Sequence, residues 1–431
     1  MSSNVLQPCI TLPLENDVLQ DIVDKAKDWA LMNGAGMRSK SNFNKDSLLV
    51  APFILLPSTF PRKEFEKAVK IQIILNELVH KVAHDYEFLS SSLKSTIEVD
   101  KFTGSLFKIY ETVRKEGVTQ TLSLGLFRSD YLVHNAANNN IKQVEINTIA
   151  SSFGGICTHI PSQHRYVLQE LGHGDKLKNV NNAVILFVVE DVTYNICDQR
   201  FHEFEIRKQN PSVKVIRRSL TEISHTAVLG ANKELIIDHM TVAVVYFRSG
   251  YEPAQYPTEA EWTARLTIER SRAIKCPSIH YHLAGTKKVQ QALAKPKNEE
   301  GNSAAEMAKT NPERYVLKPQ REGGGNNVYG EKVREALQTM HNSEERTAWI
   351  LMERISPPTQ KGYMVRPGGP EVPKLVDLVS ELGIFGVVIG DAANIRSNRQ
   401  VGYMLRTKLS DADEGGVAAG SGALDSPYLI D

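Results

Sequence analysis

The sequence predicts an α/β fold that is divided into lobes, and three observations lead to this prediction. The chain has 431 residues, 41% of them hydrophobic, which is enough to bury a large core divided over two or more lobes. Strand-like apolar runs at residues 184–189, 213–217 and 241–247 alternate with a helical stretch at 196–206. Amphipathic helices are expected at 15–32 and after Pro61, where apolar side chains recur on one face. Together these patterns predict a compact α/β lobe beside a helical scaffold.

The other expected elements follow the same alternation along the chain. Helices are predicted at residues 259–273 and from Thr286 until Pro296, because a proline ends a helix. Residues 128–131 are expected to close the strand that precedes them. Apolar runs of strand length predict strands at residues 48–56, 122–127, 143–149, 315–317, 349–352, 382–389 and 401–405.

Composition argues against several classes of function. The formal net charge is +1, so no net field draws the chain to nucleic acid or to an anionic membrane. The longest apolar run, residues 183–189, is far too short to cross a bilayer, and no basic segment followed by an apolar core opens the sequence. The four cysteines are widely separated, which argues against a structural zinc site and against a disulfide framework. We therefore expect a cytoplasmic protein that binds neither nucleic acid nor membranes.

A glycine-rich stretch, residues 318–329 with the sequence KPQREGGGNNVY, is the main chemical signal. It follows an apolar strand, and its three consecutive glycines let the backbone approach a ligand closely. Backbone N–H groups and a lysine suit phosphate oxygens, and a carboxylate suits bound Mg²⁺. The spacing matches neither the P-loop nor the dinucleotide-binding fingerprint. From this stretch alone, a polyphosphate site and a solvent-exposed hairpin are equally good interpretations.

One predicted strand alternates polar with apolar residues. It places Glu145 and Asn147 on one face and Val144 on the other. Two oxygen ligands side by side suit Mg²⁺, although a strand with a solvated polar face would show the same pattern. Ser151 and Ser152 follow in a tight turn that offers hydroxyl and N–H donors.

Other polar groups follow predicted strands. Arg248 comes after the strand at 241–247, and open α/β sheets bind ligands at the carboxyl ends of their strands. An arginine there suits a carboxylate, and a surface turn explains it equally well. Glu353 follows the strand at 349–352, whose backbone suits an adenine edge, although an ordinary core strand has the same pattern. Residues 414–420 form a Gly/Ala-rich loop that is flexible enough to act as a lid.

Taken together, these segments resemble eukaryotic glutathione synthetases. The matching motifs are EINT (145–148), RSGY (248–251), the glycine-rich stretch, MERI (352–355), SELG (380–383) and RTK (406–408), in the family's order and over nearly the whole chain. The resemblance implies an ATP-grasp fold, in which two α+β lobes hold ATP between them, with an inserted Rossmann-like α/β substrate lobe. We therefore expect a scaffold with part of the metal and dipeptide site at residues 1–180, an α/β substrate-binding lobe at 181–285, and an ATP-grasp lobe at 286–431.

The resemblance also implies which residues form the active site. It implies Mg²⁺ as the cofactor, held by Glu145, Asn147 and Glu322, and Arg406 and Lys318 as the catalytic residues. Residues implied to bind the co-substrate ATP are Glu145, Lys287, Lys318, Gln320, Glu322, Gly323, Gly324, Gly325, Asn326, Asn327, Tyr329, Met352, Glu353, Arg354, Ile355, Glu381, Lys408 and Glu414. Residues implied to bind γ-glutamylcysteine, or glycine in the case of the last three, are Arg128, Ile149, Ala150, Ser151, Ser152, Thr193, Asn195, Gln199, Arg248, Ser249, Gly250, Tyr251, Arg406, Val417 and Ala418.

The chain departs from the family pattern in a few places. Thr193 stands where a substrate-facing Glu is usual, and Glu414 stands where Asp is usual. Residues 171–183 form a short segment for the family, and the segment between Lys287 and Lys318 is clearly shorter than the family's. Because the second segment builds part of one lobe, we expect a reduced ATP-grasp lobe.

The function implied by the resemblance is ATP-dependent ligation of γ-glutamylcysteine to glycine through an acyl phosphate, by a cytoplasmic homodimer. Two alternatives stay open at this point. One is a ligase that uses another small amino acid, such as β-alanine, in place of glycine. The other is a catalytically impaired short form that acts as a binding or dimerising protein.

Overall fold

The computed structural model describes residues 5–39, 41–135, 139–173, 196–209, 213, 215–294, 301–320, 326–341, 343–417 and 421–431. The strand expected at 184–189 lies outside these residues. Within them the fold is mixed α/β, as the sequence predicts. No helix in this part of the chain combines the length and the apolar character that a bilayer crossing needs.

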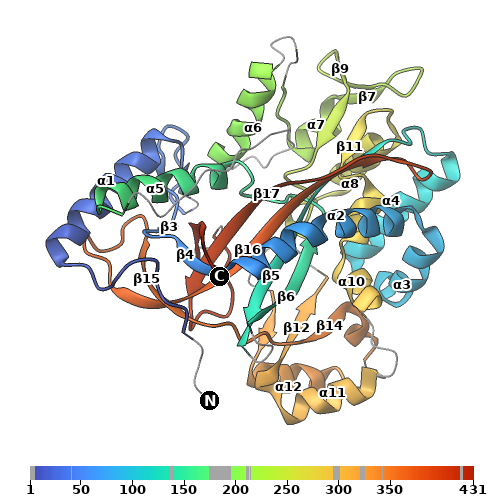
Figure 1. Cartoon of the computed structure of the whole chain (residues 1–431). Helices are drawn as coiled ribbons and strands as arrows, with labels where there is room; N and C mark the ends of the chain where they lie inside the picture. Colours follow the sequence, from blue (N-terminus) through green and yellow to red (C-terminus); the bar gives the residue numbers. More distant parts are fainter. Residues whose placement is uncertain are drawn as a thin grey trace.

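A seven-stranded sheet forms the centre of the molecule (Figure 1). Its middle is a long antiparallel hairpin, and all of its pairings are antiparallel except that of β18 with β3. The sheet joins strands from the first 147 residues of the chain with strands that follow residue 359. In spatial order they are β15 (Gln360–Val365), β3 (Phe53–Ile54), β18 (Gly422–Asp425), β17 (Ile395–Leu409), β16 (Leu375–Gly390), β5 (Ser123–His134) and β6 (Asn140–Asn147).

Two strand predictions need correction. Residues 128–131 do not close a strand, because β5 continues through them to His134. The two charged side chains among them are tolerated there because they bond to each other: Arg128 donates to Asp130. The described residues of the run at 213–217 form no strand, and Ile216 packs against the core without strand pairing. A β-branched run favours extended geometry, but a strand also needs a neighbour with which to pair.

Helices and smaller sheets surround the central sheet. The helices are α1 (Asn16–Met32), α2 (Arg62–His84), α3 (Tyr86–Val99), α4 (Lys101–Glu116), α5 (Ile160–Glu170), α6 (Ile196–Gln209), α7 (Leu220–Thr226), α8 (Glu259–Arg270), α9 (Ile279–Ala284), α10 (Lys287–Ala294), α11 (Gly301–Thr310) and α12 (Glu331–Thr339). The other strands are β1 (Gly36–Met37), β2 (Leu49–Val50), β4 (Ser58–Pro61), β7 (Ala227–Leu229), β8 (Leu235–Ile237), β9 (Met240–Val242), β10 (Val244–Tyr246), β11 (Ile274–Cys276), β12 (Tyr315–Pro319), β13 (Val328–Tyr329), β14 (Trp349–Glu353) and β19 (Pro427–Ile430).

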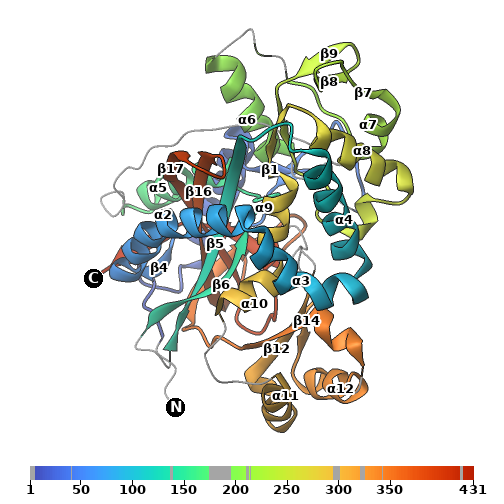
Figure 2. The same ribbon diagram turned by 90° about the vertical axis from the view of Figure 1, so that its right-hand side faces the viewer.

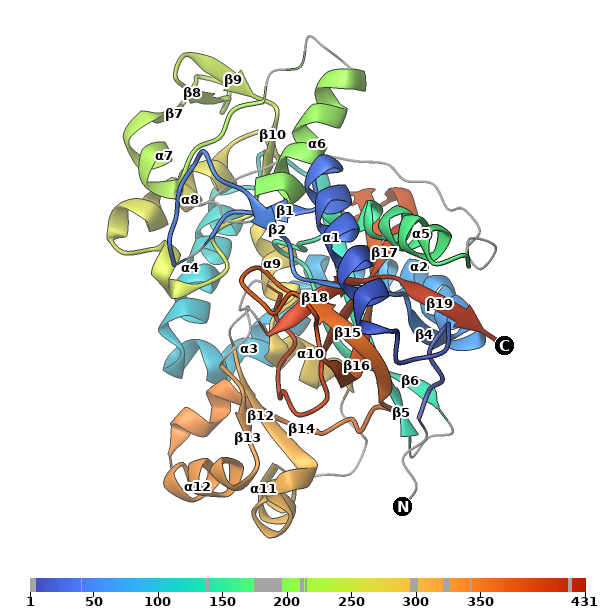
Figure 3. The same ribbon diagram turned by 90° about the vertical axis from the view of Figure 1, so that its left-hand side faces the viewer.

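A small lobe built from β12, β13 and β14 with α11 and α12 lies beside the central sheet (Figure 3). Its core contains Leu317, Val333 and Leu337, and the shortened segment adds only alanines to it from α11, Ala305 and Ala308. Because an alanine buries little apolar area, this segment contributes little to the core of the lobe.

Helix α2 lies across the hairpin of β16 and β17 (Figure 2) and meets it through buried amides. Gln72 and Asn76 are fully buried, and Gln72 Nε2 donates to Asn76 Oδ1 at 2.9 Å. Asn76 Nδ2 in turn donates to Asn398 Oδ1 at 2.8 Å. This close contact requires Gly386 on β16, because a Cβ there would lie 2.0 Å from Asn76 Oδ1.

We therefore predict that Gly386→Ala destabilises the protein. The added methyl must push α2 away from the sheet or break the amide contacts, and overpacking of this kind typically costs ~1–3 kcal/mol. Urea denaturation measures the loss. Gly301→Ala is the matched control, because nothing lies within 4 Å of a Cβ at that position. Equal stabilities for the two variants would contradict this account of how α2 packs.

Candidate active site

A cavity of about 380 Å³ opens between the central sheet and the small lobe, a volume typical of small-ligand sites. Strands β5, β6, β16 and β17 line it on one side and β12, β13 and β14 on the other. Most of the residues that the resemblance implies meet here. Those that line the cavity are Arg128, Glu145, Asn147, Ile149, Ala150, Ser152, Tyr251, Lys287, Lys318, Asn327, Tyr329, Met352, Glu353, Arg354, Ile355, Glu381, Arg406, Lys408, Glu414 and Val417.

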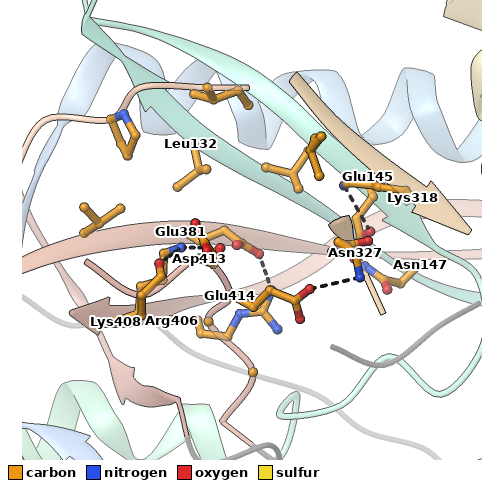
Figure 4. Close-up of a pocket in the computed structure, with 18 of the residues that line it drawn as sticks. Leu132, Glu145, Asn147, Lys318, Asn327, Glu381, Arg406, Lys408, Asp413 and Glu414 are labelled. Atoms are coloured by element: carbon orange, nitrogen blue, oxygen red, sulfur yellow. Dashed lines mark hydrogen bonds and ion pairs between the residues drawn. The ribbon is translucent and has the colours of Figure 1, made fainter. Parts of the chain in front are cut away.

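Glu145 shares the cavity with Lys318 (Figure 4) and with Lys287. Its Oε2 accepts from Lys287 Nζ at 2.8 Å and lies 3.9 Å from Lys318 Nζ. Burial raises the pKa of Glu145, but the two ammonium groups outweigh burial and hold that pKa below its usual value. The carboxylate is therefore ionised at neutral pH, and the site already contains one anion and two cations that a metal-bound polyphosphate can engage.

A β-bulge turns two consecutive residues of β6 toward the cavity. Glu145 is paired with Asp130 of β5, and Gln143 is paired with the next residue, Tyr131, so Val144 is the extra residue. Both Val144 and Glu145 line the cavity. The expected strict alternation, with Val144 on the opposite face, is therefore wrong at this position.

Arg406 of β17 and Glu381 of β16 are opposite each other in the sheet. Arg406 Nη2 donates to Glu381 Oε1 and lies 3.7 Å from Asp130 Oδ2. Burial raises the pKa of Glu381; Arg406 opposes this effect, and the Asp130 and Glu145 carboxylates add to it. The buried Nε of Arg406 has no hydrogen-bond partner among the described residues, so this guanidinium keeps a donor for a ligand.

The loop that follows β17 reaches the small lobe. Lys408 Nζ donates to the backbone oxygen of Asp413 at 2.8 Å, which holds the loop against β17. The Asp413 carboxylate accepts from Arg354 Nη2 at 2.6 Å, and the Glu414 carboxylate accepts from the backbone N–H of Asn327 at 3.3 Å. Because Arg354 and Asn327 belong to the small lobe, the loop joins the two walls of the cavity.

Two arginines meet at the turn that follows β6. Arg128 Nη1 donates to the backbone oxygen of Ser152 at 3.2 Å, and Arg248 Nη2 donates to its Oγ at 2.7 Å. Asp198 accepts from Arg248 Nη1 at 2.9 Å and from the backbone N–H of Gly155 at 2.7 Å. Burial raises the pKa of Asp198, but Arg248 and these hydrogen bonds outweigh it, so the pKa lies below its usual value. Asp198 therefore holds both the turn after β6 and the Arg248 side chain in place.

Some predicted residues do not line the cavity. Ser151 Oγ donates to the backbone oxygen of Asn147 at 3.2 Å, and Gln320 Oε1 accepts from the backbone N–H of Lys288 at 2.9 Å. These two side chains do not face the cavity; they bond to the backbone near residues that do. The described residues in this group are Ser151, Gln199, Arg248, Ser249, Gly250, Gln320 and Asn326. Outside the described residues lie Thr193, Asn195, Glu322, Gly323, Gly324, Gly325 and Ala418.

Several residues that line the cavity were not predicted from the sequence. Val379 lies two residues before Glu381 on β16, so the period of a strand places both on one face, and this signal was available. Pro357 and Thr359 lie after β14 in irregular backbone, where no periodic signal exists. The full set is Leu132, Val144, Phe153, Val316, Pro357, Thr359, Val379, Ser410, Ala412, Asp413, Gly415 and Gly416.

Glu145 and Asn147 are the described residues that fit a Mg²⁺ ion. Asn147 Nδ2 donates to Asp130 Oδ2 at 3.0 Å, so the nitrogen of the amide is engaged by protein and its oxygen is the end suited to a cation. No group of three or more His, Cys, Asp or Glu side chains able to hold a metal occurs in the described part of the chain. A cation bound between Glu145 and Asn147 would take further oxygens from its ligand, as Mg²⁺ bound to nucleotides does.

Comparison with known proteins gives a consistent result. The chain matches the family model for the ATP-binding domain of eukaryotic glutathione synthase over residues 16–298 and 296–429. It is 40% identical to the glutathione synthetase of Xenopus laevis, over 96% of this chain and 98% of the relative. It is 40% identical to that of Homo sapiens, over 96% and 97%, and 36% identical to the chloroplastic glutathione synthetase of Solanum lycopersicum, over 97% and 85%.

A solved structure is also similar: a glutathione synthetase-like effector from Globodera pallida in its apo form. It matches with a TM-score of 0.75 at 25% identity, over 97% of this chain and 98% of that one. The alignment with the Xenopus laevis protein is 469 residues long and this chain has 431, so the relative carries residues that this chain lacks. The two parts of the family match meet at 296–298, inside the segment that sequence analysis identifies as short. Because these matches extend over nearly the whole chain, it belongs to the family of eukaryotic glutathione synthetases.

Proposed function

We infer that this chain catalyses the ATP-dependent ligation of γ-glutamylcysteine to glycine, which produces glutathione. One observation carries this conclusion: a single cavity gathers Glu145, Lys287, Lys318 and Arg406, in a chain that matches glutathione synthetases over 96% of its length. Ligation of this kind needs ATP, a carboxylate and an amine in one enclosed site, because positioning and charge neutralisation supply most of the catalysis.

In this proposal ATP lies between the small lobe and the central sheet. Lys287 and Lys318 bind phosphate oxygens, and the glycine-rich stretch, which includes Asn326, covers the phosphates. The adenine lies along β14, where the backbone from Met352 to Ile355 offers hydrogen bonds to its edge. Lys408 and Glu414 close the nucleotide site from the loop after β17. The support for this placement is that these residues line one cavity from both of its walls.

Mg²⁺ in this proposal is held by Glu145, by the amide oxygen of Asn147 and by Glu322. When bound, the ion supplies neutralisation of phosphate charge. Glu145 is ionised because Lys287 and Lys318 depress its pKa, so it is ready to act as a ligand at neutral pH. Asp130 keeps the nitrogen of Asn147 engaged and the oxygen of that amide available.

The dipeptide in this proposal lies along the turn after β6. Arg128 binds one of its carboxylates through charge-assisted hydrogen bonds, and Ile149, Ala150 and Ser152 contribute backbone and hydroxyl groups. Arg248 acts through Ser152, to which it is bonded. The remaining implied contacts, Ser151, Thr193, Asn195, Gln199, Ser249, Gly250 and Tyr251, follow from the resemblance. Val417 and Ala418 form the small pocket for glycine.

The reaction has two steps. An oxygen of the cysteinyl carboxylate bonds to the γ-phosphorus while the bond from that phosphorus to ADP breaks, which gives an acyl phosphate and ADP. The glycine amine then bonds to the acyl carbon, loses a proton, and phosphate leaves. Arg406 stabilises the transferring phosphoryl group and the tetrahedral oxyanion, for which its Nε is available. The loop after β17 excludes water from the acyl phosphate.

We predict that the purified chain releases phosphate from ATP only when γ-glutamylcysteine and an amine acceptor are both present. Glycine should support faster release than β-alanine, because the small residues that the resemblance implies for the acceptor pocket, Val417 and Ala418, suit glycine. A steady-state phosphate-release assay with each acceptor tests this. Faster turnover with β-alanine would reassign the acceptor, and binding of ATP and dipeptide without turnover would indicate the catalytically impaired short form.

We also predict that Glu145→Gln folds normally but loses most of its turnover. Removing one partner of a buried charge pair commonly costs ~2–5 kcal/mol, and here the loss falls on Lys287, Lys318 and the bound cation. Phosphate release measured across a Mg²⁺ titration checks this, with thermal unfolding to confirm the fold. Normal turnover of the variant at limiting Mg²⁺ would contradict the metal assignment.

A homodimer in the cytoplasm completes the proposal. Phe43, Leu48 and Leu49 are large apolar side chains that are exposed, and Leu49 lies on the two-residue strand β2, which pairs with β1. An exposed apolar edge of this kind suits a second copy of the chain. Sedimentation equilibrium should give twice the mass of one chain, and a monomer mass would contradict the dimer. The four cysteines, all of them among the described residues, form no disulfide, which suits a reducing compartment. Microscopy that finds a tagged chain outside the cytoplasm would contradict that location.

A further inference from the structure

Asp130 is a buried carboxylate that no step of the reaction uses, although it contacts three residues that the reaction does use. It is 1% exposed and accepts two hydrogen bonds from Arg128, from Nε at 2.7 Å and from Nη2 at 2.8 Å. It also accepts from Asn147 Nδ2 at 3.0 Å. Its Oδ2 lies 3.7 Å from Arg406 Nη2. One carboxylate therefore touches residues proposed for the dipeptide, the metal and the phosphoryl group.

The three contacts come from three different strands. Arg128 lies on β5 with Asp130 itself, Asn147 lies on β6, and Arg406 lies on β17. Strand β16 separates β5 from β17, so the contact with Arg406 spans a whole strand. Such a contact is possible only if the intervening strand has no side chain at the crossing point.

Gly383 supplies that opening. In the sheet it is opposite Asp130 on one side and Met404 on the other. A Cβ at Gly383 would lie 3.0 Å from Arg128 Cδ, 3.1 Å from Asp130 Oδ1 and 2.8 Å from Met404 Cγ. The Arg128–Asp130 pair thus lies flat over the backbone of β16, where a larger residue would lift it away from Arg406.

The charges in this group also depend on Asp130. Burial and the neighbouring Arg128 lower the pKa of Arg406, but Glu381 and Asp130 outweigh them and raise it. Two guanidinium groups this close repel each other unless an anion lies between them. The Asp130 carboxylate lies between the two guanidinium groups. It also accepts from the amide nitrogen of Asn147, which leaves the oxygen of that amide available to a cation.

We propose that Asp130 is a positioning residue, which holds Arg128, Asn147 and Arg406 in one arrangement across β16 so that dipeptide, metal and phosphoryl sites have a fixed geometry. This inference rests on the proposed function of the site. Asp130 itself does not touch the reacting atoms.

The test is the kinetics of Asp130→Asn. Asparagine keeps the shape but replaces one acceptor oxygen with a donor, which then opposes the N–H groups of Arg128. We expect the KM for γ-glutamylcysteine to rise about 10- to 100-fold and kcat to fall, because loss of a supporting partner typically has an effect of this size. The affinity for ATP measured without Mg²⁺ and without dipeptide should change by less than about threefold, because Lys287, Lys318 and β14 are unaltered.

Two further variants separate positioning from general loss of stability. Glu261→Gln removes an equally buried carboxylate of α8, which is 2% exposed and accepts from Thr258 Oγ1 at 2.6 Å. It should lower the thermal midpoint but leave KM and kcat unchanged. Gly383→Ala keeps every charge but fills the opening, and it should reproduce the kinetic pattern of Asp130→Asn. It also keeps the test possible if Asp130→Asn does not fold.

Calorimetric titration of γ-glutamylcysteine in the presence of Mg²⁺ and a non-hydrolysable ATP analogue gives a readout independent of turnover. Unchanged dipeptide affinity and kcat in Asp130→Asn would overturn the proposal. So would an equal loss of affinity for metal-free ATP, or a Glu261→Gln variant with the same kinetic change. Wild-type protein that neither binds the dipeptide nor releases phosphate would instead overturn the proposed function, so the two failures are distinguishable.

Discussion

Compensation of buried charge is the constraint on which the site depends. Arg128 and Arg248 are almost completely buried, and a buried guanidinium without a partner is strongly destabilising. Each is therefore paired with a carboxylate that is itself buried, Asp130 and Asp198 respectively. These pairs cost desolvation energy and do not by themselves argue for stability. Their consequence is geometric. Two hydrogen bonds to Asp130 hold the Arg128 guanidinium in one orientation, and Arg248 is held by one bond to Asp198 and one to Ser152.

The same requirement explains why the cavity is chemically prepared for a metal-bound nucleotide. Lys287 and Lys318 are held near Glu145, so the cations are already gathered and already desolvated. In the proposed mode of binding, a polyphosphate with its cation exchanges these pairings for new ones: the lysines turn to phosphate oxygens and the carboxylate turns to the metal. Such an exchange of partners costs less free energy than bringing separate, hydrated charges together from water. The site is preorganised in this sense.

Glycines and buried amides decide how closely the elements around the site can pack. Gly386 lets the amides of α2 reach the hairpin, and Gly383 lets a charged pair cross β16. Strand β16 of the hairpin therefore contacts α2 at Gly386 and the charged residues of the cavity at Gly383, so the same strand connects the helical scaffold to the site. The small lobe is attached differently: its core is modest, α11 gives it only alanines, and the loop after β17 bridges it to the central sheet through Arg354 and Asn327.

The local pattern of the chain was enough to predict much of this protein. Apolar runs located β12, β14, β16 and β17, because strand period and length are local properties. Motif order identified the family, and most of the implied residues line one cavity. The sequence could also show that the segment before Lys318 is short.

Only the tertiary structure decided what depends on pairing between distant segments. The bulge at Val144 exists because β6 pairs with β5 in a particular register, and no local pattern contains that register. For the same reason residues 128–131 looked like the end of a strand but lie within β5, where Asp130 faces Arg406 from a segment far away in the chain. Which carboxylate neutralises which arginine is set by strand order and by the absence of a side chain at Gly383, and both are properties of the folded sheet rather than of any stretch of sequence.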